Sequence, residues 1–389
     1  MKILFLEWKS FGNEYIKAEF LRCGHEVMTF PFPQNTEDTR GSEDLAARIA
    51  TTILEKKAEL VFSFNYFPVA AVACKACKVK YVSWTYDSPY IQLYSYTLEY
   101  PTNYAFIFDK AEYLRLKAAG MDTVYYLPMA APTAYYETCV PTKEQRDKYQ
   151  TQIAMIGSMY TEKKSLFRHL ENLDEYTKGY LQAVMNTQKE IYGANLLEAA
   201  MRPDIIENVQ KVCPLQKRGD GFESVEWVFA NYFLARELTA TERQEYVKEL
   251  SERFEVTLYT PKETPALPKV RNMGAIDYYT EAPYAMKCAK INLNISLRSI
   301  VSGIPLRAWD IMGNGGFLMT NFQADFLDYF IPDEDFVYFE SKADLLEKVS
   351  YYLTHEERRM EIAQNGLRKV QEHHTYQKRV EEMFAVINQ

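Results

Sequence analysis

The chain has 389 residues, of which 47% are hydrophobic and 14% aromatic, and its formal net charge is −8. Because one hydrophobic core rarely extends beyond roughly 250 to 300 residues, this length predicts two domains. The apolar content excludes long disordered stretches, and the acidic balance argues against a protein that holds a nucleic-acid backbone electrostatically. We therefore expect a globular protein with no nucleic-acid partner.

The N-terminus, MKILFLEW, has too few apolar residues before its first acidic residue for a signal peptide and predicts a β-strand. No window holds about 18 uncharged apolar residues, so we expect no membrane span. The six cysteines are few for this length, and the lone C-x-x-C at Cys74 and Cys77 has no second pair or nearby histidine. These features predict reduced thiols and a cytoplasmic protein.

Short apolar runs alternate with amphipathic, helix-length stretches from residue 1 to about 130. Strands are expected at KILFLE, EVMTFPF, ELVFSFN, KYVSWTY, NYAFIFD and TVYYLP, with helices near 15–23, 45–57, 68–75 and 111–119. This repetition predicts a parallel sheet covered on both faces, with ligands at the carboxyl ends of its strands. We predict a Rossmann-like domain over residues 1–135.

The prolines at 128, 132 and 141, followed by a charged run, predict a hinge between 128 and 148. An α/β pattern resumes at QIAMIGSMY and continues through EVTLYT, KVRNMGA, KINLNIS, FLMTN and FVYF. Residues 162–250 lie between these strands and read as almost wholly helical. We predict an α/β fold of two facing Rossmann-like domains, the second over 150–372 with a helical insertion at about 162–250. A C-terminal helix, 373–389, is expected to cross back to the first domain.

The segment SGIPLRAWDIMGNGG predicts a short helix, Pro305 to Met312, between two strands. The N-terminus of this helix offers unpaired N–H groups to a phosphate at the carboxyl end of the preceding strand. Arg307 and Asp310 share one helix face, where they bind a phosphate and sugar hydroxyls or simply pair with each other. The glycines let the backbone approach a ligand, or they only make a tight turn.

The run GIPLRAWDIMGNGGFLMTNF, with YFESKADLLEKVSYYLTHEERRMEIAQNGLRKVQEHHTY after it, resembles the nucleotide-sugar-binding domain of bacterial GT-B glycosyltransferases. The resemblance is closest to the spore-maturation CgeB-like family and extends to LARELTATERQEYVKELSERFEVTLYT, INLNIS, SWTYDSP and YYLPMAA. The family pattern of an arginine, an aromatic residue, an acidic residue and a glycine pair is met by Arg307, Trp309, Asp310, Gly315 and Gly316.

This resemblance implies that a nucleotide-sugar binds the second domain, with Arg307 near its diphosphate and Asp310 near ribose or sugar hydroxyls. Ser302 stands where many related retaining enzymes carry a glutamate. The sequence therefore leaves the choice between a retaining and an inverting reaction open.

Further donor-side candidates follow other predicted strands. Gly157, Ser158 and Tyr160 form a loop that approaches the donor phosphates or a plain turn, and Ser296 and Arg298 reach the diphosphate or are structural. Gly274, Ala275 and Ile276 are the candidates for the base site, because a glycine lets a flat base lie against the backbone. The predicted donor-binding set is completed by Ser302, Gly303, Pro305, Arg307, Asp310, Gly315 and Gly316.

On the acceptor side, Asp87 stands just beyond a strand end, where it acts as a general base or only caps the following turn. Gly12, Asn13 and Asn65 are the lesser acceptor-side candidates. The D-x-D at Asp333 and Asp335 favours a solvated turn over a divalent-ion site. We therefore expect no metal and no cofactor, with Asp87, Arg307 and Asp310 as the catalytic residues.

Together these features predict a metal-independent glycosyltransferase, hexosyl or similar, with a nucleoside-diphosphate sugar, UDP- or GDP-linked, as donor. The acceptor is expected to be a glycan, a lipid-linked molecule or a protein, which leaves room for weak peripheral membrane association. Closure of the domains would exclude water, and Arg298, Arg307 and helix amides would stabilise the leaving diphosphate. The alternatives are a sugar-nucleotide epimerase of the same fold and a non-catalytic sugar-nucleotide or glycan-binding protein.

Overall fold

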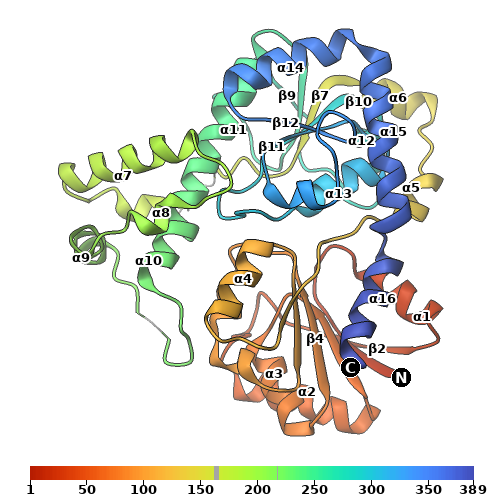
Figure 1. Ribbon diagram of the computed structural model, residues 1–389. Helices are drawn as coiled ribbons and strands as arrows, with labels where there is room; N and C mark the ends of the chain where they lie inside the picture. The colour runs from red at the N-terminus through yellow and green to blue at the C-terminus, as the bar shows by residue number, and fades with distance from the viewer. Residues whose placement is uncertain (162–165, 217) are drawn as a thin grey trace. The chain divides into compact units, whose positions relative to one another are not determined.

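The computed structural model describes residues 1–161, 166–216 and 218–389 (Figure 1). The chain divides into two compact units. Unit 1 holds Met1–Met129, the described part of Lys217–Glu223, and Thr375–Gln389; unit 2 holds Ala130–Gln216 and Ser224–His374. Residues 162–165 and 217 of the predicted insertion lie outside the described residues.

Unit 1 contains a six-stranded parallel sheet in the order β2-β1-β3-β4-β5-β6. Its strands are β1 (Lys2–Glu7), β2 (Glu26–Pro31), β3 (Leu60–Phe64), β4 (Lys80–Thr85), β5 (Asn103–Ile107) and β6 (Val124–Tyr126). Its helices are α1 (Asn13–Arg22), α2 (Glu43–Lys56), α3 (Pro68–Cys77), η1 (Ile91–Tyr94), η2 (Tyr96–Glu99), α4 (Lys110–Ala118) and α16 (Tyr376–Ile387).

The C-terminal helix α16 belongs to unit 1, although α15 before it belongs to unit 2. The Tyr376 ring lies 5.8 Å from Trp84 of β4 and 5.5 Å from Tyr15 of α1, and Phe384 contacts Phe20 edge to face. Because these aromatic rings are packed in the core of unit 1, burial of one face of α16 holds the end of the chain there. The predicted crossing of the C-terminal helix is confirmed.

Unit 2 contains a second six-stranded parallel sheet, in the order β12-β11-β10-β7-β8-β9. Its strands are β7 (Thr151–Ile156), β8 (Val256–Tyr259), β9 (Arg271–Asn272), β10 (Ala289–Asn294), β11 (Leu318–Asn321) and β12 (Val337–Phe339). Its helices are α5 (Thr133–Thr138), α6 (Lys143–Tyr149), η3 (Leu166–Leu170), α7 (Glu175–Lys189), α8 (Leu196–Ala199), α9 (Pro203–Val212), α10 (Val225–Val228), the π-helix η4 (Phe229–Leu234), α11 (Ala235–Ser251), α12 (Ala282–Cys288), α13 (Leu306–Gly313), η5 (Ala324–Asp328), α14 (Lys342–Thr354) and α15 (Glu356–His373).

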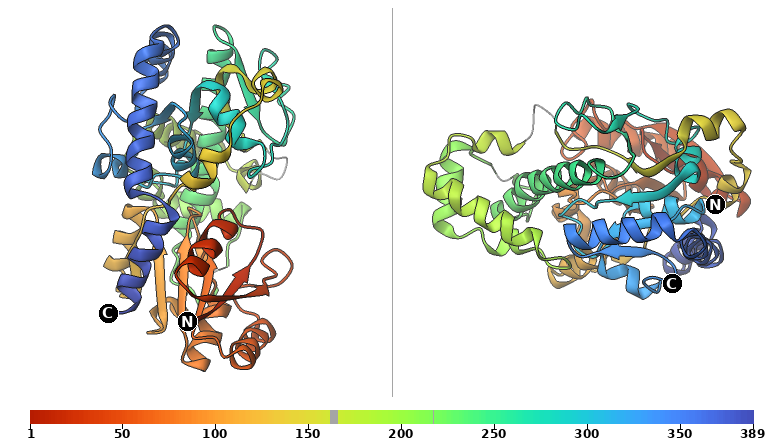
Figure 2. Two further views of the ribbon diagram at one scale, coloured as in Figure 1. Left: turned by 90° about the vertical axis from the view of Figure 1, so that its right-hand side faces the viewer. Right: turned by 90° about the horizontal axis from the view of Figure 1, so that it is seen from above.

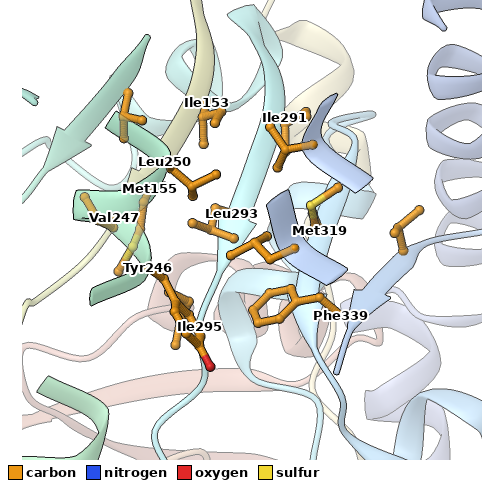
Figure 3. Packing of buried hydrophobic residues seen from close by; sticks show 14 of the residues in the cluster. Ile153, Met155, Tyr246, Val247, Leu250, Ile291, Leu293, Ile295, Met319 and Phe339 are labelled. Atoms are coloured by element: carbon orange, nitrogen blue, oxygen red, sulfur yellow. The ribbon is translucent and has the colours of Figure 1, made fainter. Parts of the chain in front are cut away.

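The strands of unit 2 bury side chains on both faces, as expected for a parallel sheet covered by helices. On one face, Ile153 and Met155 of β7 pack with Val247 and Leu250 of α11 (Figure 3). On the other face, Ala154 packs in a smaller cluster with residues of α6 and α12. The sheet is thereby held between helices, and the carboxyl ends of its strands are left for the site.

The helical insertion has a core of its own, and its helices extend sideways from the sheet of unit 2 (Figures 1 and 2). The continuous helix formed by α10, η4 and α11 contributes Phe229 and Ala230 to that core and Val247 and Leu250 to the core of the sheet. The second half of α11 is therefore a helix that covers the sheet. The prediction of a helical segment is wrong between Val212 and Val225, where the described residues are not helical.

Part of this non-helical stretch belongs to unit 1. Gly221 forms an antiparallel bridge with Ser95, and the buried Arg40 guanidinium donates to Asp220 at 2.8 Å and to Glu223 at 3.1 Å. A backbone bridge together with a buried ion pair fixes the segment there, since an unpaired Arg40 or Glu223 would carry a large desolvation cost.

Among the described residues, none of the helices combines the length and the apolar character that crossing a bilayer requires.

Candidate active site

Most of the predicted donor-side residues lie at the carboxyl ends of β7, β9 and β10 or near the N-terminus of α13. Gly157 directly follows β7, has a φ of 136° and donates its N–H to the Tyr259 carbonyl at 3.0 Å. Helix α13 begins at Leu306, one residue later than predicted, because Pro305 is its N-cap. Among the described residues, no side-chain cap hydrogen bond is made at this N-terminus, so its first N–H groups are suited to binding an anion.

Arg307 lies against the loop that follows β7. A Cβ built on Gly157 would lie only 2.4 Å from Arg307 Nη2, so the absence of a side chain at Gly157 makes room for the guanidinium. Arg307 Nη1 donates to Asn294 Oδ1 at 3.4 Å, and no ion pair among the described residues includes Arg307. Burial lowers the pKa of the guanidinium. A partly buried cation with a single neutral partner is suited to binding an anion.

Two further arginines, which the prediction from the sequence did not include, reach the same loop from α11. The guanidinium carbons of Arg236 and Arg243 each lie 4.7 Å from the centroid of the Tyr160 ring, and Arg243 also donates to the carbonyls of Ile295 and Ser158. Burial, together with the nearby Arg307 charge, lowers the pKa of Arg243 to about 10. Their spacing of seven residues, which places both arginines on one helix face, was the signal in the sequence.

Replacement of Gly157 by alanine should weaken anion binding at this loop. The Cβ would collide with the Arg307 guanidinium, and a φ of 136° is strained for any residue with a side chain. We expect a lower melting temperature and about tenfold weaker binding of a nucleoside diphosphate, measured by calorimetry. Gly179→Ala, with nothing within 4 Å of the added Cβ, is the control. Unchanged binding by Gly157→Ala would contradict the close approach of the two groups.

Asp310 does not have the environment that the sequence suggested. Its side chain is fully buried; Oδ1 accepts a hydrogen bond from the Tyr136 hydroxyl at 2.8 Å, and Oδ2 accepts one from the Tyr278 hydroxyl. The described hydrogen bonds of Asp310 and Arg307 go to other residues, and Asp310 is buried, so the alternative of a pair on a solvated face is wrong. Its position also does not support direct binding of sugar hydroxyls, because the carboxylate is fully buried.

Burial raises the pKa of Asp310 to about 7, against the opposing effects of both tyrosine hydroxyls and Arg307. Because this pKa lies above that of an aspartate in the unfolded chain, the group favours the folded state at acid pH, and this contribution is lost as pH rises from about 4 through about 7. Asp310→Asn should remove this part of the pH dependence, measured as the free energy of unfolding in urea at pH 5 and pH 8. An identical pH dependence of unfolding in wild type and variant would contradict a raised pKa at Asp310.

Arg298 was predicted to reach the diphosphate, but its contacts give it a structural role. Its guanidinium pairs with the buried carboxylate of Glu242 and donates to the carbonyls of Lys189 and Ile191 at 3.0 Å each. The guanidinium carbon also lies 3.8 Å from the centroid of the Tyr192 ring. With its donors occupied in this way, Arg298 holds the end of α7 against α11.

The remaining predicted donor residues divide between the two edges of the sheet. Ser296 lies at the carboxyl edge, where its N–H donates to Asn321 Oδ1 at 2.7 Å, and Ser302 and Gly303 belong to the loop before α13. Gly315 and Gly316 directly precede β11 and so lie at the amino edge, away from the candidate site. This position gives no support to their predicted role in donor binding.

The glycines at the end of α13 serve a tight turn. Gly315 has a φ of 77°, and a Cβ on Gly316 would lie 2.8 Å from Asn292 Nδ2. Gly315 supplies the left-handed backbone conformation of the turn, and Gly316 leaves room for the Asn292 side chain. Of the two roles that the sequence left open for the glycines, this is the one that the contacts support.

The predicted base site lies in the loop after β9. Gly274 has a φ of 79°, its N–H donates to Asn272 Oδ1 at 3.0 Å, and a Cβ added to it would meet nothing within 4 Å. Ala275 follows it, and Ile276 packs against the cluster that contains Tyr259 and Ala285. The loop thus combines an anchored end with open space beside Gly274.

In unit 1, Asn65 and Asp87 meet at the carboxyl ends of β3 and β4. Asn65 Nδ2 donates to Asp87 Oδ2 at 2.7 Å, and Asn65 Oδ1 accepts from the backbone N–H groups of Tyr86 and Asp87. Asp87 has solvent-exposed surface. Desolvation by the surrounding protein raises the pKa of its carboxyl group, and the Asn65 hydrogen bond opposes this rise. An accessible carboxylate with a raised pKa is suited to accepting a proton.

The other acceptor-side candidates are held by contacts within unit 1. Asn13 is buried, with its amide group bonded to Ser10 Oγ and to the Trp8 carbonyl. Gly12 has a φ of 88°, and a Cβ there would lie 2.5 Å from the Tyr376 hydroxyl. Both residues shape the loop between β1 and α1.

In unit 2, Asp335 of the D-x-D segment is buried and bonded to the Ile331 N–H and to Lys369.

Comparison with known protein sequences gives one family match. Residues 238–385 match the family model described as "Glycosyl transferase-like". No curated protein sequence matches the chain significantly.

Solved structures match over nearly the whole chain. HepE from Anabaena, in complex with UDP and glucose, is 11% identical with a TM-score of 0.57, and the match covers 100% of this chain and 99% of that one. Sucrose-phosphate synthase from Thermosynechococcus elongatus is 10% identical with a TM-score of 0.56, over 100% and 98% of the two chains. A glycosyltransferase from Rickettsia africae is 10% identical with a TM-score of 0.52, over 99% and 97%.

The two parallel sheets and these matches confirm the predicted pair of Rossmann-like domains. The protein therefore has the fold of GT-B glycosyltransferases, and its residues 238–385 match a glycosyltransferase-like family model.

Proposed function

We propose that this protein is a glycosyltransferase that moves a sugar from a nucleoside-diphosphate sugar, bound on unit 2, to an acceptor bound on unit 1. The observation that carries the proposal is the Arg307 guanidinium, which lies against Gly157 beside the uncapped N-terminus of α13 and has no carboxylate partner among the described residues. The family match over residues 238–385 and the GT-B fold support nucleotide-sugar transfer.

The leaving diphosphate would receive its stabilisation from cationic side chains and backbone amides. Arg307 and the first N–H groups of α13 would contact the phosphates, while Arg243 holds the loop after β7 and adds positive charge beside them. Fixed donors in a site that excludes water stabilise developing negative charge strongly, so the proposal includes a metal-independent reaction. Because HepE binds UDP, we propose a UDP-linked donor, with a hexose as the transferred sugar.

On unit 1, Asp87 would accept the proton of the acceptor hydroxyl if the reaction inverts the configuration of the sugar, with Asn65 fixing the carboxylate. The acceptor would be a glycan, a lipid-linked molecule or a protein. The finer resemblance to the CgeB-like family, the cytoplasmic location and weak association with a membrane surface stay predictions.

A direct test is to incubate the purified protein with UDP- and GDP-sugars, with and without EDTA, and to measure nucleoside-diphosphate release and nucleotide binding. We expect one nucleotide series to bind and to turn over when an acceptor is supplied, with EDTA having no effect. Conversion of the donor sugar without any acceptor would favour the epimerase, and binding without turnover in any mixture would favour a binding protein. Absence of binding by every nucleotide would overturn the proposal.

A further inference from the structure

Three segments of unit 2 that are distant in sequence meet at the carboxylate of Asp310. Tyr136 of α5 donates to Oδ1, and Tyr278, from the loop between β9 and α12, donates to Oδ2. Asp310 itself lies one turn into α13, with its side chain fully buried. A buried carboxylate that accepts from two hydroxyl groups fixes both donors, because loss of either bond would leave charge or polar surface unsatisfied.

The loop that contains Tyr278 is the predicted base-binding loop. Its second half is a turn organised by Asp277, whose Oδ1 accepts from Tyr279 and Thr280. The Tyr279 carbonyl accepts a hydrogen bond from the Tyr135 hydroxyl at 2.6 Å. Two adjacent tyrosines of α5 therefore hold this loop. Tyr135 binds the loop backbone directly, and Tyr136 binds the Asp310 carboxylate, which in turn holds Tyr278.

Helix α13 carries contacts to both loops of the proposed donor site. Arg307 reaches Gly157 after β7, and Asp310, one turn further on, reaches the loop after β9 through Tyr278. Since a helical turn is rigid, it sets the distance between the place of the diphosphate and the place of the base.

From this geometry we propose that Asp310 is a positioning residue that holds residues 273–281, through Tyr278, in the conformation that receives the nucleobase of the donor. The proposal rests on the proposed function and deepens it, because it assigns the base to this loop and gives Asp310 no direct contact with the sugar. Tyr136 keeps the carboxylate oriented toward Tyr278 and is the third member of this hydrogen-bonded group.

The test compares Tyr278→Phe with wild type, since this change removes one hydroxyl and keeps the ring. We expect backbone amides of 273–281 to exchange with deuterium about tenfold faster and the affinity for UDP to fall about tenfold. The maximal rate at saturating UDP-sugar should stay within about threefold of wild type, because the residues that contact the diphosphate are unchanged. Tyr136→Phe should give a smaller change of the same kind.

Asp335→Asn is the matched control, because it weakens a buried carboxylate's contacts with Ile331 and Lys369 elsewhere in unit 2. It should lower stability without changing exchange in 273–281 or UDP affinity. If Tyr278→Phe lowers stability in the same way and leaves both exchange and affinity at wild-type values, the positioning role is overturned. If wild type binds no nucleotide, the proposed function fails, whereas the exchange of 273–281 still decides whether Asp310 holds the loop.

Discussion

Replacement of Arg307 by methionine should weaken binding of a nucleoside diphosphate by about a hundredfold. The guanidinium lies beside Gly157 and the N-terminus of α13, and within the described parts of the chain its one hydrogen bond is to Asn294, at 3.4 Å. Loss of charge-assisted hydrogen bonds to a phosphate in a partly buried site costs this order of affinity, while methionine keeps most of the side-chain volume. Calorimetric titration with UDP and GDP measures the effect.

Two variants make the comparison sharper. Arg307→Lys should bind with intermediate affinity, because an ammonium group keeps the charge and loses the bidentate geometry. Arg359→Met removes another buried arginine of unit 2, one that donates to the Tyr352 carbonyl in a different part of the fold, and should leave nucleotide affinity unchanged. If Arg307→Met binds nucleoside diphosphates with wild-type affinity, Arg307 does not bind the diphosphate and the proposed function loses its main support.

Replacement of Asp87 by asparagine should lower the rate of sugar transfer by about a thousandfold while donor binding stays at its wild-type value. An amide of the same shape cannot accept the acceptor proton, and general-base catalysis contributes on the order of 10² to 10⁴ in rate. The Asn65 hydrogen bond to position 87 can be kept through the amide oxygen, so the fold of the strand ends should be retained. Steady-state kinetics with UDP-sugar and acceptor, together with UDP titration, separate the two effects.

The same experiment should also determine the anomeric configuration of the product, because Asp87 is proposed as the base only for an inverting reaction. An inverted product together with a slow Asp87→Asn variant would support the base. Asp122→Asn, at a fully exposed carboxylate of unit 1, is the control and should transfer sugar at the wild-type rate. A retained configuration with an unimpaired Asp87→Asn variant would exclude Asp87 as the base.

Much of the architecture could be predicted because it depends on local patterns. Each of the two sheets follows from apolar runs of strand length separated by amphipathic helices, and the helix at Leu306–Gly313 follows from a proline and a glycine cluster at its ends. Arg307 and Gly157 were identified for the same reason, since each stands directly beside a predicted strand end or helix start. These signals lie within a few residues of the position that they describe.

The partners of individual side chains depended on residues far away in the sequence, and only the tertiary structure decided them. Asp310 meets Tyr136, which is 174 positions away, and Arg298 meets Glu242, which is 56 positions away. Both were predicted as donor ligands because their local surroundings suit that role, yet a charged group binds whatever opposite or hydrogen-bonding partner the folded chain brings to it.

The tertiary structure also decides at which edge of the sheet, the amino or the carboxyl edge, a residue lies. Gly315 and Gly316 follow a helix whose N-terminus faces the candidate site, but the helix runs across the sheet and leaves them at the opposite edge. By itself, the sequence determined the order of the strands and helices and the residues at their ends, because short-range sterics and periodic burial decide these. Only the tertiary structure decided which charged groups remain open to a ligand, because that depends on which distant side chains have already satisfied them.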